Sequence, residues 1–66
     1  MNILLNGATR FAPDNATLLR ILTDYKIKPD TVAVEYNGRI LPKDDFDKTN
    51  LSDNDTVEIL HFVGGG

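Results

Sequence analysis

The stretch VAVEYNGRIL, residues 32–41, decides the expected fold because it reads as two strands joined by a tight turn. Its first half, Val32–Tyr36, is rich in β-branched residues, which favour a strand. Asn37-Gly38 is a strong signal for a two-residue type I′ turn, since both central residues of that turn need positive φ. The segment therefore predicts a β-hairpin that returns through Arg39–Leu41 and ends at Pro42.

A second hairpin is expected at the start of the chain. Met1–Leu5 reads as a strand, and Asn6-Gly7 repeats the turn signal. A short return strand is expected through Thr9–Ala12. Pro13-Asp14-Asn15 then breaks the pattern, so a different element must connect the two hairpins.

That connecting element is predicted to be the one main helix, over roughly residues 16–26. Thr17 or Asn15 is expected to cap it by accepting hydrogen bonds from its free backbone amides. The apolar residues of this segment follow the i, i+3, i+4, i+7 spacing that places them on one face, which is expected to pack on a sheet. They are Leu18, Ile21, Leu22 and Tyr25.

The remainder of the chain is expected to form a long connection, a last strand and a tail. Lys43–Asn50 is charged and weakly helical, with Phe46 and Leu51 as inward anchors. Thr56–Val63 reads as the last strand, and a flexible glycine tail follows over residues 64–66. The chain thus predicts a domain over residues 1–63 of the α+β class, with a mixed sheet of four to five strands and one helix on one face. If the first and last strands are parallel neighbours, the right-handed crossover rule leads to a β-grasp.

Length and composition exclude several classes of protein. A chain of 66 residues has a thin core, so a deep enclosed active site is disfavoured and no catalytic residue is expected. The absence of cysteine excludes disulfides, thiolate metal sites and cysteine nucleophiles. One histidine, His61, cannot build a multi-histidine site, and it reads as a strand-edge residue rather than a general base. We expect no metal and no bound cofactor.

Charge and hydropathy also limit the partners and the location. The net charge of −3 disfavours binding to nucleic-acid backbones, which need clustered lysine and arginine. No apolar run approaches the roughly 20 residues needed to span a membrane. We therefore expect a cytoplasmic protein, monomeric when free, whose partners are other proteins.

The last strand is expected to carry apolar side chains on both faces. Val57 and Ile59 are assigned to the helix-covered face, which leaves Leu60 and Phe62 on the outer face beside the tail. Leu4 shares that outer face if the first and last strands are neighbours. A small apolar patch of this kind is the expected docking surface for an enzyme that handles the tail. The alternative is a sheet that tolerates a few exposed apolar residues.

The tail itself offers one reactive group, the terminal carboxylate. Glycine has no Cβ, so Gly64, Gly65 and Gly66 form a backbone thin enough to enter a narrow channel. The ionised carboxylate is a poor electrophile until another protein activates it. Adenylation followed by attack of a sulfur nucleophile would give a terminal thiocarboxylate without any catalytic side chain in this chain. The alternative reading is a frayed end or an expression remnant.

Several of these segments together resemble the ThiS family of ubiquitin-like sulfur carriers, over nearly the whole chain. The resemblance rests on Met1–Gly7, Thr17-Leu18-Leu19, Val32–Gly38, Ile40-Leu41-Pro42-Lys43 and Val63–Gly66.

The resemblance implies a β-grasp fold and a role in thiamine (thiazole) biosynthesis. It implies ATP-dependent adenylation of Gly66 by a ThiF-like adenylyltransferase, conversion to a thiocarboxylate with a sulfur-donor protein, and sulfur delivery to thiazole synthase. Gly65 matches the second member of the terminal diglycine of the family. ATP would be used by the activating enzyme and not held by the carrier. Three rivals stay open, namely a molybdopterin-synthase-type carrier, a ubiquitin-like protein modifier and a non-covalent interaction domain.

Overall fold

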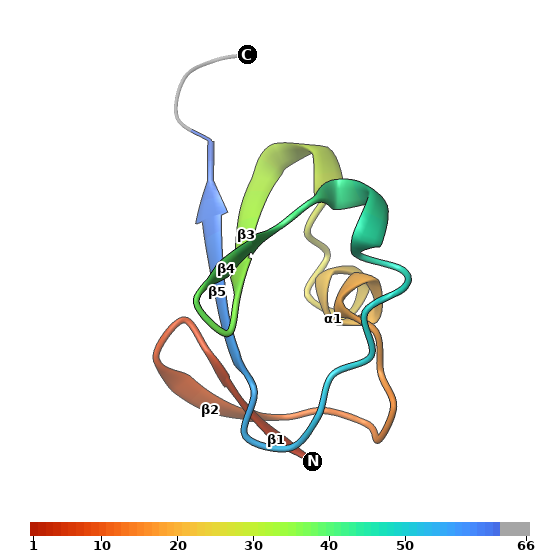
Figure 1. Ribbon diagram of the computed structural model, residues 1–66, viewed down its shortest axis with the longest axis vertical. Helices are drawn as coiled ribbons and strands as arrows, with labels where there is room; N and C mark the ends of the chain where they lie inside the picture. Colours follow the sequence, from red (N-terminus) through yellow and green to blue (C-terminus); the bar gives the residue numbers. More distant parts are fainter. Residues whose placement is uncertain (63–66) are drawn as a thin grey trace.

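A five-stranded mixed sheet with one helix on one face forms the protein (Figure 1). The computed structural model describes residues 1–62 of the chain. Two short 3₁₀ turns, Pro29–Thr31 and Lys43–Asp45, lie in the connections. The regular elements are β1 (Asn2–Leu5), β2 (Ala8–Phe11), α1 (Leu18–Asp24), β3 (Val32–Tyr36), β4 (Arg39–Leu41) and β5 (Thr56–His61).

The strand order β2-β1-β5-β3-β4 places the first and last strands side by side. β1 and β5 run parallel, with Leu4 opposite Thr56 and Leu5 opposite Val57. The other neighbouring strands are antiparallel. The predicted adjacency is therefore confirmed, and with it the β-grasp arrangement of a mixed sheet and one helix.

Both predicted hairpin turns are present with the expected backbone geometry. Asn6 and Gly7 have φ of 48° and 81°, and Asn37 and Gly38 have φ of 49° and 86°. Asparagine tolerates this left-handed conformation better than other side chains, and glycine has no Cβ to oppose it. The Asn-Gly pairs thus set the register of the β1–β2 and β3–β4 hairpins.

The helix is shorter than its apolar pattern suggests. Thr17 caps it, since its side chain accepts a hydrogen bond from the Arg20 amide at 3.1 Å, whereas Asn15 adopts φ of 64° outside the helix. α1 ends at Asp24, and Lys26 turns the chain away with φ of 59°. Tyr25 is consequently 45% exposed, so its predicted place in the core was wrong.

The core lies between the inner face of the sheet and α1, and the long connection closes it. The backbone of Leu18 donates to Thr49, and that of Leu51 donates to Ala16, at 3.0 and 2.8 Å. Phe46 and Leu51 are buried as predicted. The buried apolar residues are Ile3, Leu5, Ala12, Ala16, Leu18, Ile21, Leu22, Val32, Val34, Phe46, Leu51, Val57 and Ile59.

In the part of the chain that the structure describes, no helix has both the length and the apolar character needed to cross a membrane.

Candidate functional site

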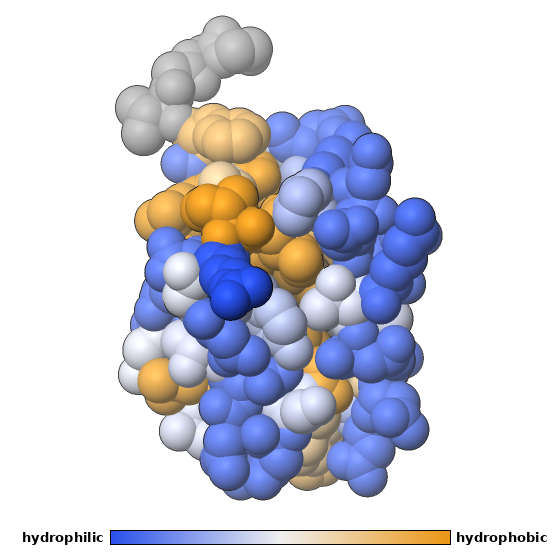
Figure 2. All heavy atoms as spheres, viewed as in Figure 1, coloured by the Kyte–Doolittle hydropathy of each residue, from blue (hydrophilic) through white to orange (hydrophobic). Residues whose placement is uncertain are grey.

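The end of β5 presents large apolar side chains to solvent. Leu60 is 56% exposed and Phe62 is 64% exposed, whereas Val57 and Ile59 are buried against the core. The predicted alternation along this strand is therefore present. Figure 2 shows apolar side chains gathered at this end of the molecule. β5 delivers the chain to the end of the molecule opposite the N-terminus (Figure 1).

Ile40 is a further member of this surface that the sequence reasoning missed. It lies on β4 opposite Glu35, while Leu60 lies opposite Ala33 on the same central strand β3. Val32 and Val34 face the core, so their neighbours Ala33 and Glu35 and the partners of these residues face outward. Ile40 is 65% exposed. We define the outer apolar patch as Leu60, Phe62 and Ile40.

The signal that could have revealed Ile40 is the same alternation that placed Leu60. Leu41 pairs with the buried Val34, so the residue before Leu41 must face outward. A large apolar side chain at that position is informative once the strand order brings it near other exposed apolar residues.

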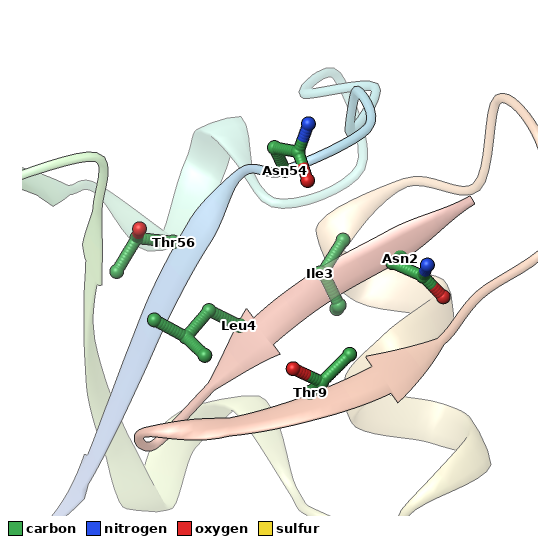
Figure 3. Close-up of a pocket in the computed structure, with 6 residues that line it drawn as sticks. All are labelled: Asn2, Ile3, Leu4, Thr9, Asn54 and Thr56. Carbon is green, nitrogen blue, oxygen red and sulfur yellow. The ribbon is translucent and has the colours of Figure 1, made fainter.

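Leu4 is on the outer face but is not part of the outer apolar patch. It is 39% exposed and pairs with Thr56, four residues before Leu60 on β5. At about 3.3 Å per residue it therefore lies about 13 Å from Leu60 along the strand. Leu4 instead lines a shallow hollow of about 200 Å³ (Figure 3). The other residues around the hollow are Asn2, Ile3, Thr9, Asn54 and Thr56.

The three tail residues named from the sequence, Gly64, Gly65 and Gly66, lie outside the described residues. The chain is fixed up to Phe62, whose backbone N–H donates to the carbonyl of Thr31 at 3.0 Å. The sheet therefore holds the backbone to within four residues of Gly66.

Asn6 fastens the last part of β5 to β1. Its Oδ1 accepts a hydrogen bond from the Ile59 N–H at 2.6 Å, and its Nδ2 donates to the Ile59 carbonyl at 3.4 Å. Its own backbone N–H donates to the carbonyl of Val57 at 2.9 Å. One side chain thus continues the pairing of β1 with β5 after β1 has turned into its hairpin.

Substitution of Asn6 should separate the contribution of this side chain from that of the turn. Asn6→Gly keeps the positive φ but removes both bonds to Ile59, and we expect a loss of about 1 kcal/mol in the free energy of unfolding. Asn6→Ala adds the cost of a Cβ in the left-handed region, about 1 kcal/mol more. Urea denaturation measures both. Equal stability of Asn6→Gly and the unchanged chain would show that the bonds contribute nothing.

A second network ties the start of β5 to the β3–β4 hairpin. The Tyr36 hydroxyl donates to Asp55 Oδ2 at 2.5 Å, and Asn37 Nδ2 donates to Asp55 Oδ1 at 3.1 Å. The Ser52 N–H also donates to Asp55, at 2.7 Å. Burial alone would raise the pKa of Asp55, but the bonds from Tyr36, Ser52 and Asn37 outweigh it and lower the pKa. The bond to Asp55, burial and the Asp55 charge together raise the pKa of Tyr36 to about 12.

The pair should make stability depend on pH at both ends of the range. Because the pKa of Asp55 is lowered on folding, its contribution is present above about pH 4 and is lost as the pH falls further. Because the pKa of Tyr36 is raised, its contribution is present below about pH 10 and is lost as the pH rises towards 12. We expect Tyr36→Phe to cost about 1.5 kcal/mol near pH 7 and less at either extreme. Denaturation at several pH values measures the difference in the free energy of unfolding between the unchanged chain and Tyr36→Phe. A difference that does not change with pH would contradict the hydrogen bond between Tyr36 and the Asp55 carboxylate.

The acidic residues Glu35 and Glu58 pair across β3 and β5 on the outer face, beside the outer apolar patch. His61 is exposed at the end of β5 opposite Val32, the strand-edge position expected for it. Within residues 1–62, no group of three histidine, aspartate or glutamate side chains is arranged to hold a metal ion. What this end of the molecule offers is an apolar surface at the end of β5.

Comparison with known proteins gives consistent matches in sequence and structure. The model of the ThiS family matches residues 3–66. The sulfur carrier protein ThiS of Bacillus subtilis is 38% identical over 63 residues, which cover 94% of this chain and 96% of that protein. A thiazole synthase of Magnetococcus marinus is 35% identical over 66 residues, covering all of this chain but 20% of that protein. The crystal structure of a thiamine biosynthesis protein (ThiS) from Geobacter metallireducens superposes with a TM-score of 0.86 at 35% identity, covering 100% of both chains.

Proposed function

Because this chain belongs to the ThiS family and is a sulfur carrier protein of thiamine biosynthesis, we propose that the carboxylate of Gly66 is the group that carries the sulfur. The observation that supports this most directly is the extent of the family match, which runs through the terminal glycines to residue 66. The described fold adds a strand, β5, that leads the chain towards this terminus. The carrier is a protein substrate and not an enzyme.

The chemistry needs two steps, both performed on the carrier by other proteins. In the first, a carboxylate oxygen of Gly66 attacks the α-phosphorus of ATP, and pyrophosphate leaves. In the second, hydrosulfide attacks the acyl carbon of the adenylate, AMP leaves, and a thiocarboxylate remains. Where the sulfur arrives as a persulfide on the donor protein, the attack gives an acyl disulfide, and a thiol then reduces its S–S bond to release the thiocarboxylate. This chain supplies the carboxylate and the surface by which it is held, while ATP is the co-substrate of the activating enzyme.

We assign three partners to the carrier: a ThiF-like adenylyltransferase, a sulfur-donor protein and a thiazole synthase. The last is supported by the thiazole synthase of Magnetococcus marinus, since one fifth of that protein is similar to the whole of this chain. Dependence on ATP also supports a cytoplasmic location for the carrier.

We propose a division of labour within the chain, which the exposure of Leu60 and Phe62 supports. The β-grasp domain, residues 1–63, presents Leu60 and Phe62 as the surface on which the activating enzyme docks. Ile40 extends this surface, and Leu4 contributes to docking only where a partner reaches the other end of β5. Gly64 and Gly65 are proposed as the part of the tail that the enzyme recognises, because a backbone without Cβ atoms fits a narrow channel.

The first step can be tested by isotope exchange. A ThiF-like enzyme should move label from pyrophosphate into ATP when this carrier is present and not when it is omitted. Exchange that is equally fast without the carrier, or absent with it, would contradict adenylation of Gly66. The outcome does not depend on the sulfur source, so it isolates the activation step.

A further inference from the structure

β5 has a short open backbone edge immediately before the tail, and we infer that an extended segment of the activating enzyme pairs with this edge as an additional strand. The inference rests on the proposed function, because the enzyme that pairs here is the one that adenylates Gly66. It concerns the backbone of His61, not the apolar side chains of the outer face.

One side of β5 is fully used by β3. The N–H of Phe62 donates to Thr31, and the carbonyl of Thr56 accepts from Asn37, at 3.0 and 2.9 Å. Leu60 is paired with Ala33 between these positions. The backbone groups of alternate residues of an inner strand point to opposite sides, so the residues between these must pair on the β1 side.

On the β1 side the pairing stops after Ile59. The carbonyls of Asp55 and Val57 accept from the backbones of Leu4 and Asn6 at 2.8 and 2.9 Å. Both backbone groups of Ile59 then bond to the Asn6 side chain. Asn6 is the last residue available there, because the chain turns into β2.

His61 is the next residue whose backbone points to the β1 side. Within residues 1–62, β1 pairs with β5 only at Thr56 and Val57, so no strand lies opposite the N–H and carbonyl of His61 on that side. Figure 1 shows β5 extending past the β1–β2 hairpin. Within the described residues, the open edge is therefore the N–H and carbonyl of His61, and the Asn6 side chain occupies the preceding position on that side.

The position of this edge favours an occupant that acts on Gly66, and the adenylyltransferase is the first enzyme to do so. Gly66 follows His61 by five residues, which span at most about 18 Å when extended. An enzyme that acts on Gly66 must therefore hold the chain alongside the end of β5. An extended backbone is the partner that satisfies both an N–H and a carbonyl at a sheet edge, and Leu60 and Phe62 flank the edge with apolar contacts. Because the Asn6 side chain already bonds to the backbone of Ile59, the open edge is too short for non-specific pairing with the strands of other proteins.

The test compares His61→Pro with His61→Ala as the matched control. Both remove the imidazole, but only proline removes the N–H, and proline is tolerated at an edge whose N–H makes no bond within the sheet. Its extended predecessor Leu60 already has the backbone that a following proline favours. We expect His61→Pro to lower kcat/KM for adenylation about fivefold to tenfold relative to His61→Ala. Equal values for the two variants would overturn the inference.

Hydrogen exchange on the unchanged chain keeps the inference testable if His61→Pro does not fold. The amide of His61 should exchange at least about tenfold more slowly in the complex with the adenylyltransferase, whereas the amide of Leu60 is already protected by β3. No added protection of His61 would overturn the inference. Protection that grows with carrier concentration in the absence of enzyme would also overturn it, since the occupant would be a second copy of this chain. Failure of the unchanged carrier to be adenylated would instead contradict the proposed function.

Discussion

Deletion of Gly66 is expected to lower thiocarboxylate formation by at least about 100-fold while leaving the free energy of unfolding within about 0.5 kcal/mol of the unchanged chain. The shortened chain still ends in a glycine carboxylate, so the reactive group is chemically the same. Its position is not, because each residue spans up to about 3.6 Å and a displacement of 1 Å can cost a factor of about 100. Intact-mass analysis of the sulfur-loading reaction measures the first effect, and urea denaturation measures the second.

The control for this deletion is a tail of unchanged length. Removing any one of the three glycines gives the same shortened sequence, so the deletion tests reach rather than the identity of one residue. Gly64→Ala keeps the length and adds one methyl group, and we expect it to retain loading within about tenfold. Full loading of the shortened chain would show that the distance from β5 to the carboxylate is not what the activating enzyme requires.

Leu60→Glu is expected to lower kcat/KM for adenylation by about 30-fold, as for loss of an interface residue worth about 2 kcal/mol. Leu60 is 56% exposed and lies in the outer apolar patch, so a charge there opposes docking without entering the core. Steady-state kinetics with the ThiF-like enzyme measure the effect, and thermal unfolding should show little change.

Phe11→Glu is the matched control for Leu60→Glu. Phe11 is 80% exposed on the same outer face and is paired with Asn2, so it lies about 20 Å from Leu60 along the strand direction. Both variants lower the net charge by one, so long-range steering changes equally. Equal losses for the two variants would assign the effect to charge rather than to contact, and no loss for Leu60→Glu would remove the patch from the docking surface.

Much of the fold is predictable from the sequence because the turn signals, the apolar alternation and the compactness of a short chain all indicate the same arrangement of strands and helix. Each Asn-Gly pair specifies a turn with positive φ, and each turn fixes the two strands that flank it. Alternation in β5 places Val57 and Ile59 in the core, which leaves Leu60 and Phe62 outside. The error at Tyr25 arose because the apolar period continues one residue past the end of the helix, where Lys26 turns the chain.

The rest of the site depends on contacts between residues far apart in the sequence. The separation of Leu4 from Leu60 follows from the register of β1 on β5. Two residue pairs define this register, and the periodicity of the sequence does not predict it. Ile40 belongs to the outer apolar patch although its strand, β4, is separated from β5 by β3. The Asn6 bond to Ile59 joins residues 53 positions apart and has no local signature. Pairing between residues far apart in the sequence therefore determines where these side chains lie relative to one another, which the alternation within a single strand does not predict.

Fragment mass analysis of the carrier, after reaction with a ThiF-like enzyme, ATP and a sulfur source, decides whether sulfur is carried on the carboxylate of Gly66. We expect the exchange of one oxygen for one sulfur, confined to the C-terminal fragment that contains Gly66 and dependent on ATP. An unmodified C-terminal fragment, or sulfur found elsewhere in the chain, would contradict it.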